Sequence, residues 1–387
     1  MNNELKNILI SKIIIGLVSG FLLIGLPIFL LDIGISLSEI GFVFGITMFF
    51  YAILSFYLGS LSESSGRLWI GTLSIIGMAI ASILFGIIPL LSLTIALIVF
   101  IIGKILFNLS ESILRNIVKI RILDISNHRR LGTGYGLLIF ADSLGYGFGI
   151  LLGGLLLSIV SFQIVFLGLT ILLIFSLPFY KKTGDIKIKS EKEKILHISN
   201  LVNTSKVFKI VLLINTILLF GAYLVDFFGL PLFQKEILGM TTQQIFILLG
   251  SAWLIYGLFS HLGGKLYDKY GLKVFIVSLF MIAVTSVLLA FAKDIILFSS
   301  LLILDYIFFS FADPARFALA GFVSRKNKGM LLSFFEFFSI LIAAIVMLFF
   351  GKLVSLFNFE FIFILRGAIQ LVAIFFVMLI YHKIHEK

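Results

Sequence analysis

Ionisable side chains inside long apolar segments are the groups of this sequence that could do chemistry. A charged side chain at the centre of a lipid bilayer costs at least ~2.5 kcal/mol, so each one requires a partner or a function. A carboxyl group kept from water holds its proton more tightly, and this can couple proton binding to a change of conformation. The residues in this class are Lys104, Glu111, Asp142, Asp226, Asp305, Glu336 and Arg366.

Asp142 is the first of these to consider. It stands three residues before Gly145 in an expected helix at 133–158, and glycines at helical spacing let a second helix pack closely. We expect this carboxyl group at an interface between helices from different halves of the chain, as a proton-coupling group or as a structural hydrogen-bond or ion-pair partner. Tyr256 and Ser260 lie at a similar depth in another expected helix and could hydrogen-bond it.

Asp305 and Arg366 predict an ion pair. Their expected helices are 294–315 and 357–381, and a rise of 1.5 Å per residue places both side chains near the middle of a bilayer. We expect a structural pair rather than a contact with substrate.

Two further charged groups occupy equivalent ends of their expected helices. Glu111 precedes Arg115 by one helical turn, and Asp313 precedes Arg316 by three residues. We expect these charges to anchor a gate or a loop.

The composition requires a membrane. Hydrophobic residues make up 60% of the chain and charged residues 13%, against about 25% in an ordinary soluble domain. The apolar period is helical rather than alternating, which argues against a barrel. Cysteine is absent, and this excludes disulfides, iron–sulfur clusters, thiolate zinc sites and thiol catalysis.

The net charge of +11 is a topology signal rather than a sign of nucleic-acid binding. Most of the 30 Lys and Arg residues fall in segments at one side of the expected helices. Lys235, Lys293 and Lys352 fall at the other side, and Lys104 and Arg366 lie within helices. By the positive-inside rule, this is a multi-pass protein of the cytoplasmic membrane with both termini in the cytoplasm.

About twelve segments are long enough to span a bilayer, which needs about 20 apolar residues each. They lie near 8–31, 39–58, 68–90, 92–113, 133–158, 161–180, 207–231, 243–264, 272–291, 294–315, 329–350 and 357–381. The polar stretch 181–206 is a cytoplasmic linker between an N-terminal six-helix bundle, 1–180, and a C-terminal one, 207–387. The fold class is therefore all-α, with two pseudo-symmetric bundles.

The two halves repeat one another. Pro27-Ile-Phe-Leu-Leu-Asp32 corresponds to Pro231-Leu-Phe-Gln-Lys-Glu236, 204 residues later, and Gly59-Ser-Leu-Ser-Glu63 corresponds to Gly264-Lys-Leu-Tyr-Asp268, 205 residues later. Internal duplication with a substrate site between the repeats is a common transporter design.

The pattern Gly-x-Leu-x-acid-x-x-Gly in both loops resembles the loop signature of the major facilitator superfamily. The resemblance implies alternating access, with the acid of each loop at the positive N-terminus of a helix from the other half. It places Glu63 against the eleventh expected segment, 329–350 (helix 11 of the family), and Asp268 against the fifth, 133–158 (helix 5), closing the cytoplasmic side in the outward-facing state. The implied gate residues are Gly59, Glu63, Gly66, Arg67, Gly264, Asp268 and Gly271.

Helix 5 carries a second resemblance, to the glycine-rich motif of the antiporters in this family. Ile150 stands where that motif has a proline. The family pattern implies that the glycines pack against helix 8, the segment 243–264. The residues concerned are Gly136, Gly145, Gly149, Gly153 and Gly154.

Helix 4 is similar to the family pattern in which a basic residue precedes a glycine by four, with Lys104 in place of arginine and Asn108 in place of glycine. Helices 4 and 7 line the cavity in this family. The implied residues of proton coupling or the substrate path are Lys104, Asn108, Glu111, Asp142, Asn215 and Asp226.

The leading functional hypothesis is a proton-coupled exporter of small amphipathic or lipophilic molecules that acts as a monomer. The alternative is an importer or facilitator for sugars, organic acids or other metabolites. An apolar cavity with few fixed charges would favour the exporter, and paired charges with carboxamides would favour the metabolite transporter. A membrane-embedded lipid enzyme is a remote alternative, because clustered acids and histidine-rich metal sites are not found; we expect no enzyme activity, metal or cofactor.

Overall fold

The computed structural model describes residues 3–64, 67–125, 131–183, 206–225, 229–323 and 328–385. The first set of long helices is α1 (Asn3–Asp32), α2 (Leu37–Ser64), α3 (Arg67–Ile87), α4 (Leu93–Ile125), α5 (Leu131–Leu157) and α6 (Phe162–Lys181). The second set is α8 (Lys206–Val225), α9 (Gly229–Glu236), α10 (Thr242–Tyr270), α11 (Leu272–Phe291), α12 (Ile295–Val323) and α13 (Lys328–His385). A short 3₁₀ turn, Ile88–Leu90, follows α3.

Each of the twelve expected spans has a helical counterpart. Within the described ranges, ten helices are long and apolar enough to cross a membrane, and two shorter apolar helices, Glu39–Leu54 and Phe337–Phe349, lie within α2 and α13. The protein is thus an all-α, multi-pass membrane protein. Most of the expected linker, 184–205, lies outside the described residues.

Two expected helices meet at a kink without a loop between them. The segments 329–350 and 357–381 both lie in α13, which consists of two helices that meet at Asn358, where φ is 61°. Asparagine tolerates positive φ better than other residues with a side chain. The Asn358 side chain also accepts a hydrogen bond from the Phe361 amide at 3.0 Å, so it caps the second part of α13.

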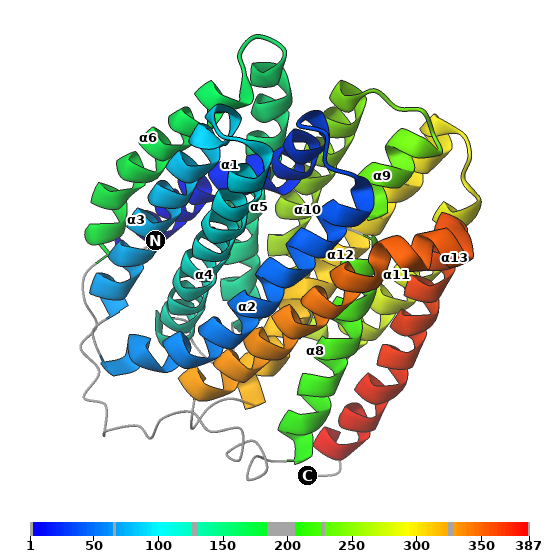
Figure 1. Cartoon of the computed structure of the whole chain (residues 1–387). Coiled ribbons are helices and arrows are strands. Elements are labelled where there is room, and N and C mark those ends of the chain that lie inside the picture. The colour runs from blue at the N-terminus through cyan, green and yellow to red at the C-terminus, as the bar shows by residue number, and fades with distance from the viewer. Residues whose placement is uncertain are drawn as a thin grey trace.

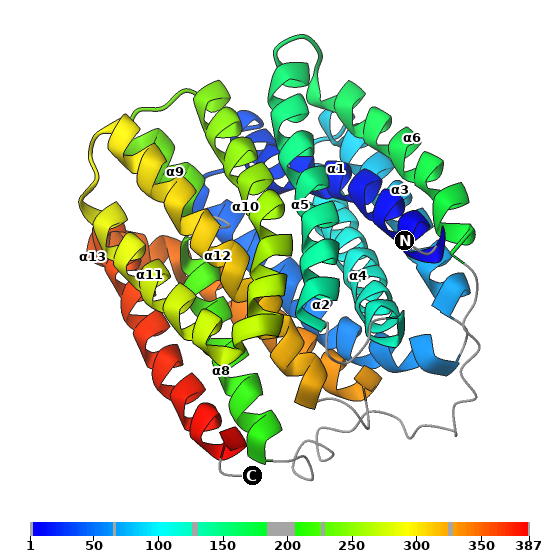
Figure 2. The ribbon, with the colours of Figure 1, turned by 180° about the vertical axis from the view of Figure 1, so that it is seen from behind.

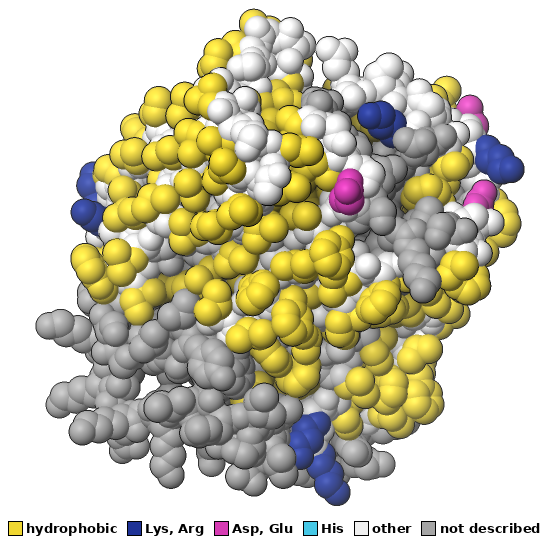
Figure 3. Space-filling model, in the orientation of Figure 1, with side chains coloured by type: hydrophobic (Ala, Val, Ile, Leu, Met, Phe, Trp, Pro, Cys, Tyr) yellow, Lys and Arg dark blue, Asp and Glu magenta, His cyan; other side chains and the backbone are white. Residues whose placement is uncertain are grey.

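The outer faces of the helices are apolar. On α3 the exposed hydrophobic residues recur every three or four positions, which puts them on one stripe; they are Trp69, Leu73, Ile76, Ile80, Ile83 and Ile87. Figure 3 shows hydrophobic side chains over most of one face, with Lys and Arg near its margins. This surface suits lipid tails.

The two sets of helices meet along two pairs. At the front, α2 lies beside the first part of α13 (Figure 1), and at the back α5 lies beside α10 (Figure 2). We call the end of the molecule where α5 begins and α10 ends the linker face. A cluster of buried residues near this face joins the two sets, with Tyr135 of α5 stacked on Phe317 of α12 at a centroid distance of 5.8 Å.

Candidate functional site: a central cavity between the two helix sets

A cavity of about 270 Å³ lies between the two sets of helices and is lined by α1, α2, α4 and α5 on one side and α8, α10, α12 and α13 on the other. The structure brings most of the sequence-predicted residues together here. Those lining the cavity are Lys104, Asn108, Glu111, Asp142, Asn215, Asp305 and Arg366. Asp226 lies outside the described residues, and the side chain of Glu336 lies outside them too.

Asp142 forms an ion pair that the sequence did not reveal. Lys12 Nζ of α1 lies 2.8 Å from Asp142 Oδ1, and only 3% of Lys12 is exposed. The expected partners were wrong: Tyr256 donates to Asp313 instead, and Ser260 donates to the carbonyl oxygens of Gly136 and Gly257. Depth along a helix gave the level of these side chains but not the direction in which they point.

The glycine stripe of α5 also has a different neighbour from the expected one. A Cβ added at Gly145 would overlap the Ile13 carbonyl, and one at Gly149 would overlap the Leu17 carbonyl, both in α1. Gly153 faces Phe21 of α1. The prediction that this stripe packs against α10 is therefore wrong, since it lies within the first helix set.

A second row of small residues on α5 faces α10. Gly136 and Gly154 of the predicted motif belong to it, because Cβ atoms there would crowd the Ser260 carbonyl and Phe246. The other positions of this row are Gly132, Ser143 and Gly147, which face Gly264, Gly257 and Leu254. Helix α5 is therefore closely packed on both sides, with α1 and with α10.

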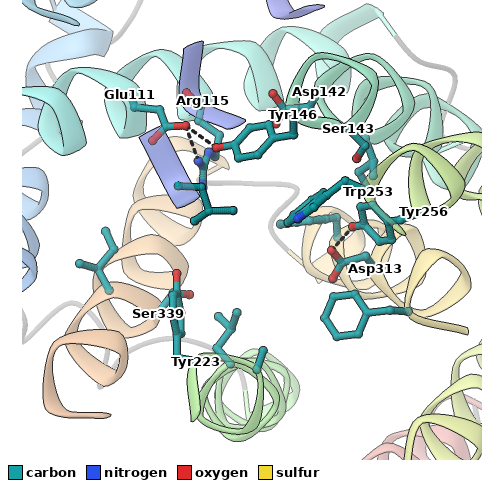
Figure 4. A pocket seen from close by; sticks show the side chains of 18 of the residues that line it. Glu111, Arg115, Asp142, Ser143, Tyr146, Tyr223, Trp253, Tyr256, Asp313 and Ser339 are labelled. Atoms are coloured by element: carbon teal, nitrogen blue, oxygen red, sulfur yellow. Dashed lines mark hydrogen bonds and ion pairs between the residues drawn. The ribbon is translucent and has the colours of Figure 1, made fainter. Parts of the chain in front are cut away.

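Glu111 of α4 has two partners beside the cavity (Figure 4). Arg115 Nη2 lies 2.9 Å from Glu111 Oε1, and the Tyr146 hydroxyl of α5 donates to the same oxygen at 2.7 Å. The Tyr146 ring stacks on Trp253 of α10 at a centroid distance of 5.1 Å. The carboxylate is thus linked through one tyrosine to the second helix set.

A matching cluster lies on the other side of the cavity. Asp313 Oδ1 is 2.8 Å from Arg316 Nη2, and the Tyr256 hydroxyl donates to Asp313 Oδ2 at 2.5 Å. Arg316 also donates to Asn215 Oδ1 at 2.9 Å, and the Asn215 amide donates to Ser339 Oγ at 2.9 Å. Asn215 is therefore held by α12 and α13 side chains rather than left free for a substrate.

Lys104 differs from the other cations around the cavity. Its ammonium group lies 5.1 Å from the centroid of the Phe44 ring. In the described part of the chain, no carboxylate lies within ion-pair distance of it. Asn108, one turn further along α4, has only a long contact of 3.7 Å with Met48 Sδ.

Among the ion pairs of the described residues, Asp305–Arg366 is the most deeply buried. Asp305 Oδ2 lies 2.9 Å from Arg366 Nη2, and both side chains are 1% exposed. Thr285 donates to Asp305 Oδ1 at 2.5 Å, and Arg366 donates to Ser286 at 3.0 Å, so α11 contributes partners to both charges.

The variant Asp305→Leu should destabilise the protein strongly, because it removes the carboxylate that lies 2.9 Å from a buried guanidinium. Removing one member of such a pair costs about 3–5 kcal/mol, whereas replacing both members with apolar residues of similar volume is often close to neutral. We expect a marked fall in the melting temperature of the detergent-solubilised protein for Asp305→Leu and recovery of most of it in Asp305→Leu/Arg366→Met. Equal melting temperatures for the single variant and the parent would contradict a structural role.

The linker face contains one of the two predicted acidic loop residues. Asp268 accepts hydrogen bonds from the amides of Gly132 at 2.9 Å and Thr133 at 2.8 Å, and from the Thr133 hydroxyl at 2.5 Å. It thus caps the N-terminus of α5, where backbone N–H groups and the helix dipole favour an anion.

The two glycines of this loop are required for different structural reasons. Gly264 touches Gly132 backbone to backbone, and Gly271, with φ at 62°, ends α10 in a conformation that glycine adopts freely. Of the first loop, Gly66 lies outside the described residues, as do the side chains of Glu63 and Arg67, while Gly59 lies within α2.

The charged residues of the cavity that sequence reasoning missed or left as anchors are Lys12, Arg115, Asp313 and Arg316. One signal was available for two of them: Asp313 and Arg316 stand 205 residues after Asn108 and Glu111, which is the offset of the loop repeat. Lys12 lies only four residues into its apolar segment, and so the sequence places it with the flanking charges.

Comparisons with known proteins agree with this architecture. The family profile described as Major Facilitator Superfamily matches residues 8–273. A comparison with curated protein sequences finds no match.

Solved structures of similar fold include the human organic anion transporter MFSD10 (TETRAN), at a TM-score of 0.78 and 13% identity over 97% of this chain and 99% of that one. They also include the proton:xylose symporter XylE, at a TM-score of 0.79 and 14% identity over 97% of this chain and 95% of that one. A bacterial homologue of the iron transporter ferroportin in an outward-facing state matches at a TM-score of 0.73 and 16% identity, over 98% of this chain and 99% of that one. The family match covers well over half of the sequence, and the chain is a member of the major facilitator superfamily of membrane transporters.

Proposed function

We propose that this chain is a secondary active transporter that exchanges a small molecule for protons. The observation that supports this most directly is the pair of carboxylates beside the cavity: Asp142 belongs to α5, and Glu111 accepts a hydrogen bond from Tyr146 of α5. Helix α5 packs along α10 of the second set. A proton taken up by either carboxylate would therefore act on a helix that borders both the cavity and the moving interface.

The exchange would use the Lys12–Asp142 pair as its switch. Protonation of Asp142 removes the attraction to Lys12 and weakens the tie between α1 and α5. Loss of the proton restores it. Since a substrate and a proton bias the two access states in opposite ways, each would drive the other across the membrane.

The hydrogen bonds of Asp268 support a role for the linker face as the gate. While they persist, α5 and α10 are held together at that end of the cavity. Opening toward that side requires them to break and α5 to separate from α10. We place this face at the cytoplasm, with both termini, on the distribution of Lys and Arg.

The charges around the cavity favour a polar or charged cargo over a purely lipophilic one. Four ion pairs contribute to its lining, which also includes the carboxamide of Asn108 and that of Asn215, the latter held by Arg316 and Ser339. Paired charges and carboxamides are the features expected of a metabolite transporter. They support the second candidate function, an importer or facilitator for metabolites such as organic acids.

Proton exchange and simple facilitation are separated by fluorescence of a pH probe inside proteoliposomes with an imposed proton gradient. The panel contains organic acids, sugars and cationic drugs, each also followed for uptake. Substrate-dependent collapse of the gradient is the expected result of exchange. Equilibration of a compound without any effect on the gradient would contradict proton coupling and support the facilitator.

A further inference from the structure

We propose that the central cavity binds a small organic anion, with its acidic group at Lys104 and its apolar body against the aromatic side chains of α10 and α12. This inference rests on the proposed function, since it concerns the cargo of the same cavity. It is carried by the balance of charge in the lining and by the position of the aromatic rings.

The described lining of the cavity contains one more basic residue than acidic residues. The described lining contains five basic residues and four acidic ones: Lys12, Lys104, Arg115, Arg316, Arg366, Glu111, Asp142, Asp305 and Asp313. All four carboxylates are engaged in ion pairs of 2.8–2.9 Å with the other four cations. Among the described residues, Lys104 is the cavity cation with no carboxylate within ion-pair distance, and Glu111 acts on it only from further away.

Lys104 is nevertheless well buried, at 7% exposed. An ammonium group that is removed from water without a counter-charge is costly, and the face of the Phe44 ring offsets only a small part of that cost. A ligand with one negative charge would supply the missing counter-charge. Asn108, whose amide has only a long sulfur contact, lies one turn away and can donate a further hydrogen bond to the same acid.

The opposite wall of the cavity provides an apolar surface. Trp253 contacts Tyr256 at a centroid distance of 5.4 Å and Tyr306 at 6.0 Å, and Tyr256 contacts Phe309 at 6.0 Å. The Tyr256 hydroxyl is occupied by Asp313, so its ring rather than its polar end is available to a ligand. Figure 4 shows Trp253 and Tyr256 on one side of the pocket, facing Tyr223 and Ser339.

The size and chemistry of the cavity limit the ligand class. Its volume of about 270 Å³ lies just below the range of about 300–1,000 Å³ that is typical of ligand pockets, so the ligand must be small. A lysine ammonium is a compact point charge without the planar fork of arginine, so it can pair with a carboxylate, a sulfonate or a phosphate. The acidic group could belong to a free metabolite or to an anionic lipid headgroup, and the test must separate these two sources.

Binding can be followed with Trp253 itself. The chain has two tryptophans, and Trp69 is 61% exposed on the outer face of α3, so Trp69→Phe leaves a single reporter in the cavity. The protein is placed in nanodiscs of phosphatidylcholine only, and its fluorescence is titrated with three ligands of one shape: cyclohexanecarboxylate, cyclohexanecarboxamide and cyclohexylmethylammonium. A parallel sample in nanodiscs with phosphatidylglycerol tests the lipid source.

We expect the carboxylate to bind at least tenfold more tightly than the amide, and the ammonium compound to bind least. In the Trp69→Phe background, Lys104→Gln should remove the preference for the carboxylate, Lys104→Arg should retain it, and the exposed control Lys235→Gln should leave it unchanged. The ligand series needs no change at Lys104, so it holds even if Lys104→Gln folds poorly. Competition of phosphatidylglycerol with the carboxylate would identify a lipid headgroup as the anion.

Equal binding of carboxylate and amide, or tighter binding of the ammonium compound, would overturn the inference. The flux assay of the proposed function separates the two ideas. Transport of neutral or cationic compounds alone would refute the anion site and leave the proposed transport function standing. Lys104-dependent binding of the carboxylate without flux of any compound would support the anion site and refute the transport function.

Discussion

Replacing Asp142 with asparagine should abolish proton-driven accumulation of substrate while leaving exchange of substrate for substrate intact. A gradient of one pH unit is worth 1.36 kcal/mol, so one-for-one exchange can concentrate a substrate about tenfold. Asparagine cannot gain or lose the proton that links the gradient to the cavity. The variant should therefore bring substrate only to equal concentrations on the two sides, in proteoliposomes where the parent reaches the tenfold limit.

This variant needs a control for stability, because Asp142 balances the buried Lys12. Asp142→Asn leaves that ammonium without its counter-charge, and the double variant Lys12→Gln/Asp142→Asn removes this cost. Counterflow should be intact in the double variant even if the single one is unstable. Asp294→Asn is a matched control: Asp294 is exposed and caps α12 by accepting from the amides of Ile296 and Leu297, and asparagine caps equally well.

Gradient-driven accumulation that survives in Asp142→Asn would show that the Lys12–Asp142 pair is structural. The coupling group would then be sought at Glu111, which has a link to the second helix set through Tyr146 and Trp253. The neutral variant Glu111→Gln gives the corresponding test.

The helical layout could be predicted from the sequence because it depends on length and composition alone. A bilayer about 30 Å thick requires apolar runs of about 20 residues, and these are legible without any knowledge of packing. The same argument gives the depth of each side chain in the bilayer, which is why an ion pair of Asp305 with Arg366 could be predicted from the sequence. It does not give the break at Asn358, where an asparagine rather than a loop separates two helical segments.

The neighbours of each helix could not be predicted in this way, since they depend on rotation about the helix axis. The stripe of Gly145, Gly149 and Gly153 was visible as a surface for close packing, yet nothing in it distinguishes α1 from α10. The pairing of Asp142 with Lys12 rather than Tyr256 has the same origin. Tertiary packing selects one of several partners at equal depth.

Replacing Gly264 with alanine should open the linker face and stop transport. An added Cβ would overlap the Gly132 carbonyl oxygen. The atoms nearest to it all belong to the backbone and not to a flexible side chain, so α5 and α10 would have to separate. The same separation would pull Asp268 away from the amides of Gly132 and Thr133. Overpacking of this kind costs about 1–3 kcal/mol, and a bias of that size shifts a conformational equilibrium by about 5–150-fold.

The absence of cysteine makes this shift measurable, because a single introduced thiol is the only target for a maleimide. Val118 is 2% exposed and belongs to the buried cluster around Tyr135 near the linker face. In a Val118→Cys background, Gly264→Ala should raise the labelling rate within the range of that shift. Gly168→Ala is the matched control, since a Cβ at Gly168 would meet no atom within 4 Å. If Gly264→Ala loses transport but labels at the same rate as the parent and Gly168→Ala, the close contact of Gly132 with Gly264 would serve stability and not the gate.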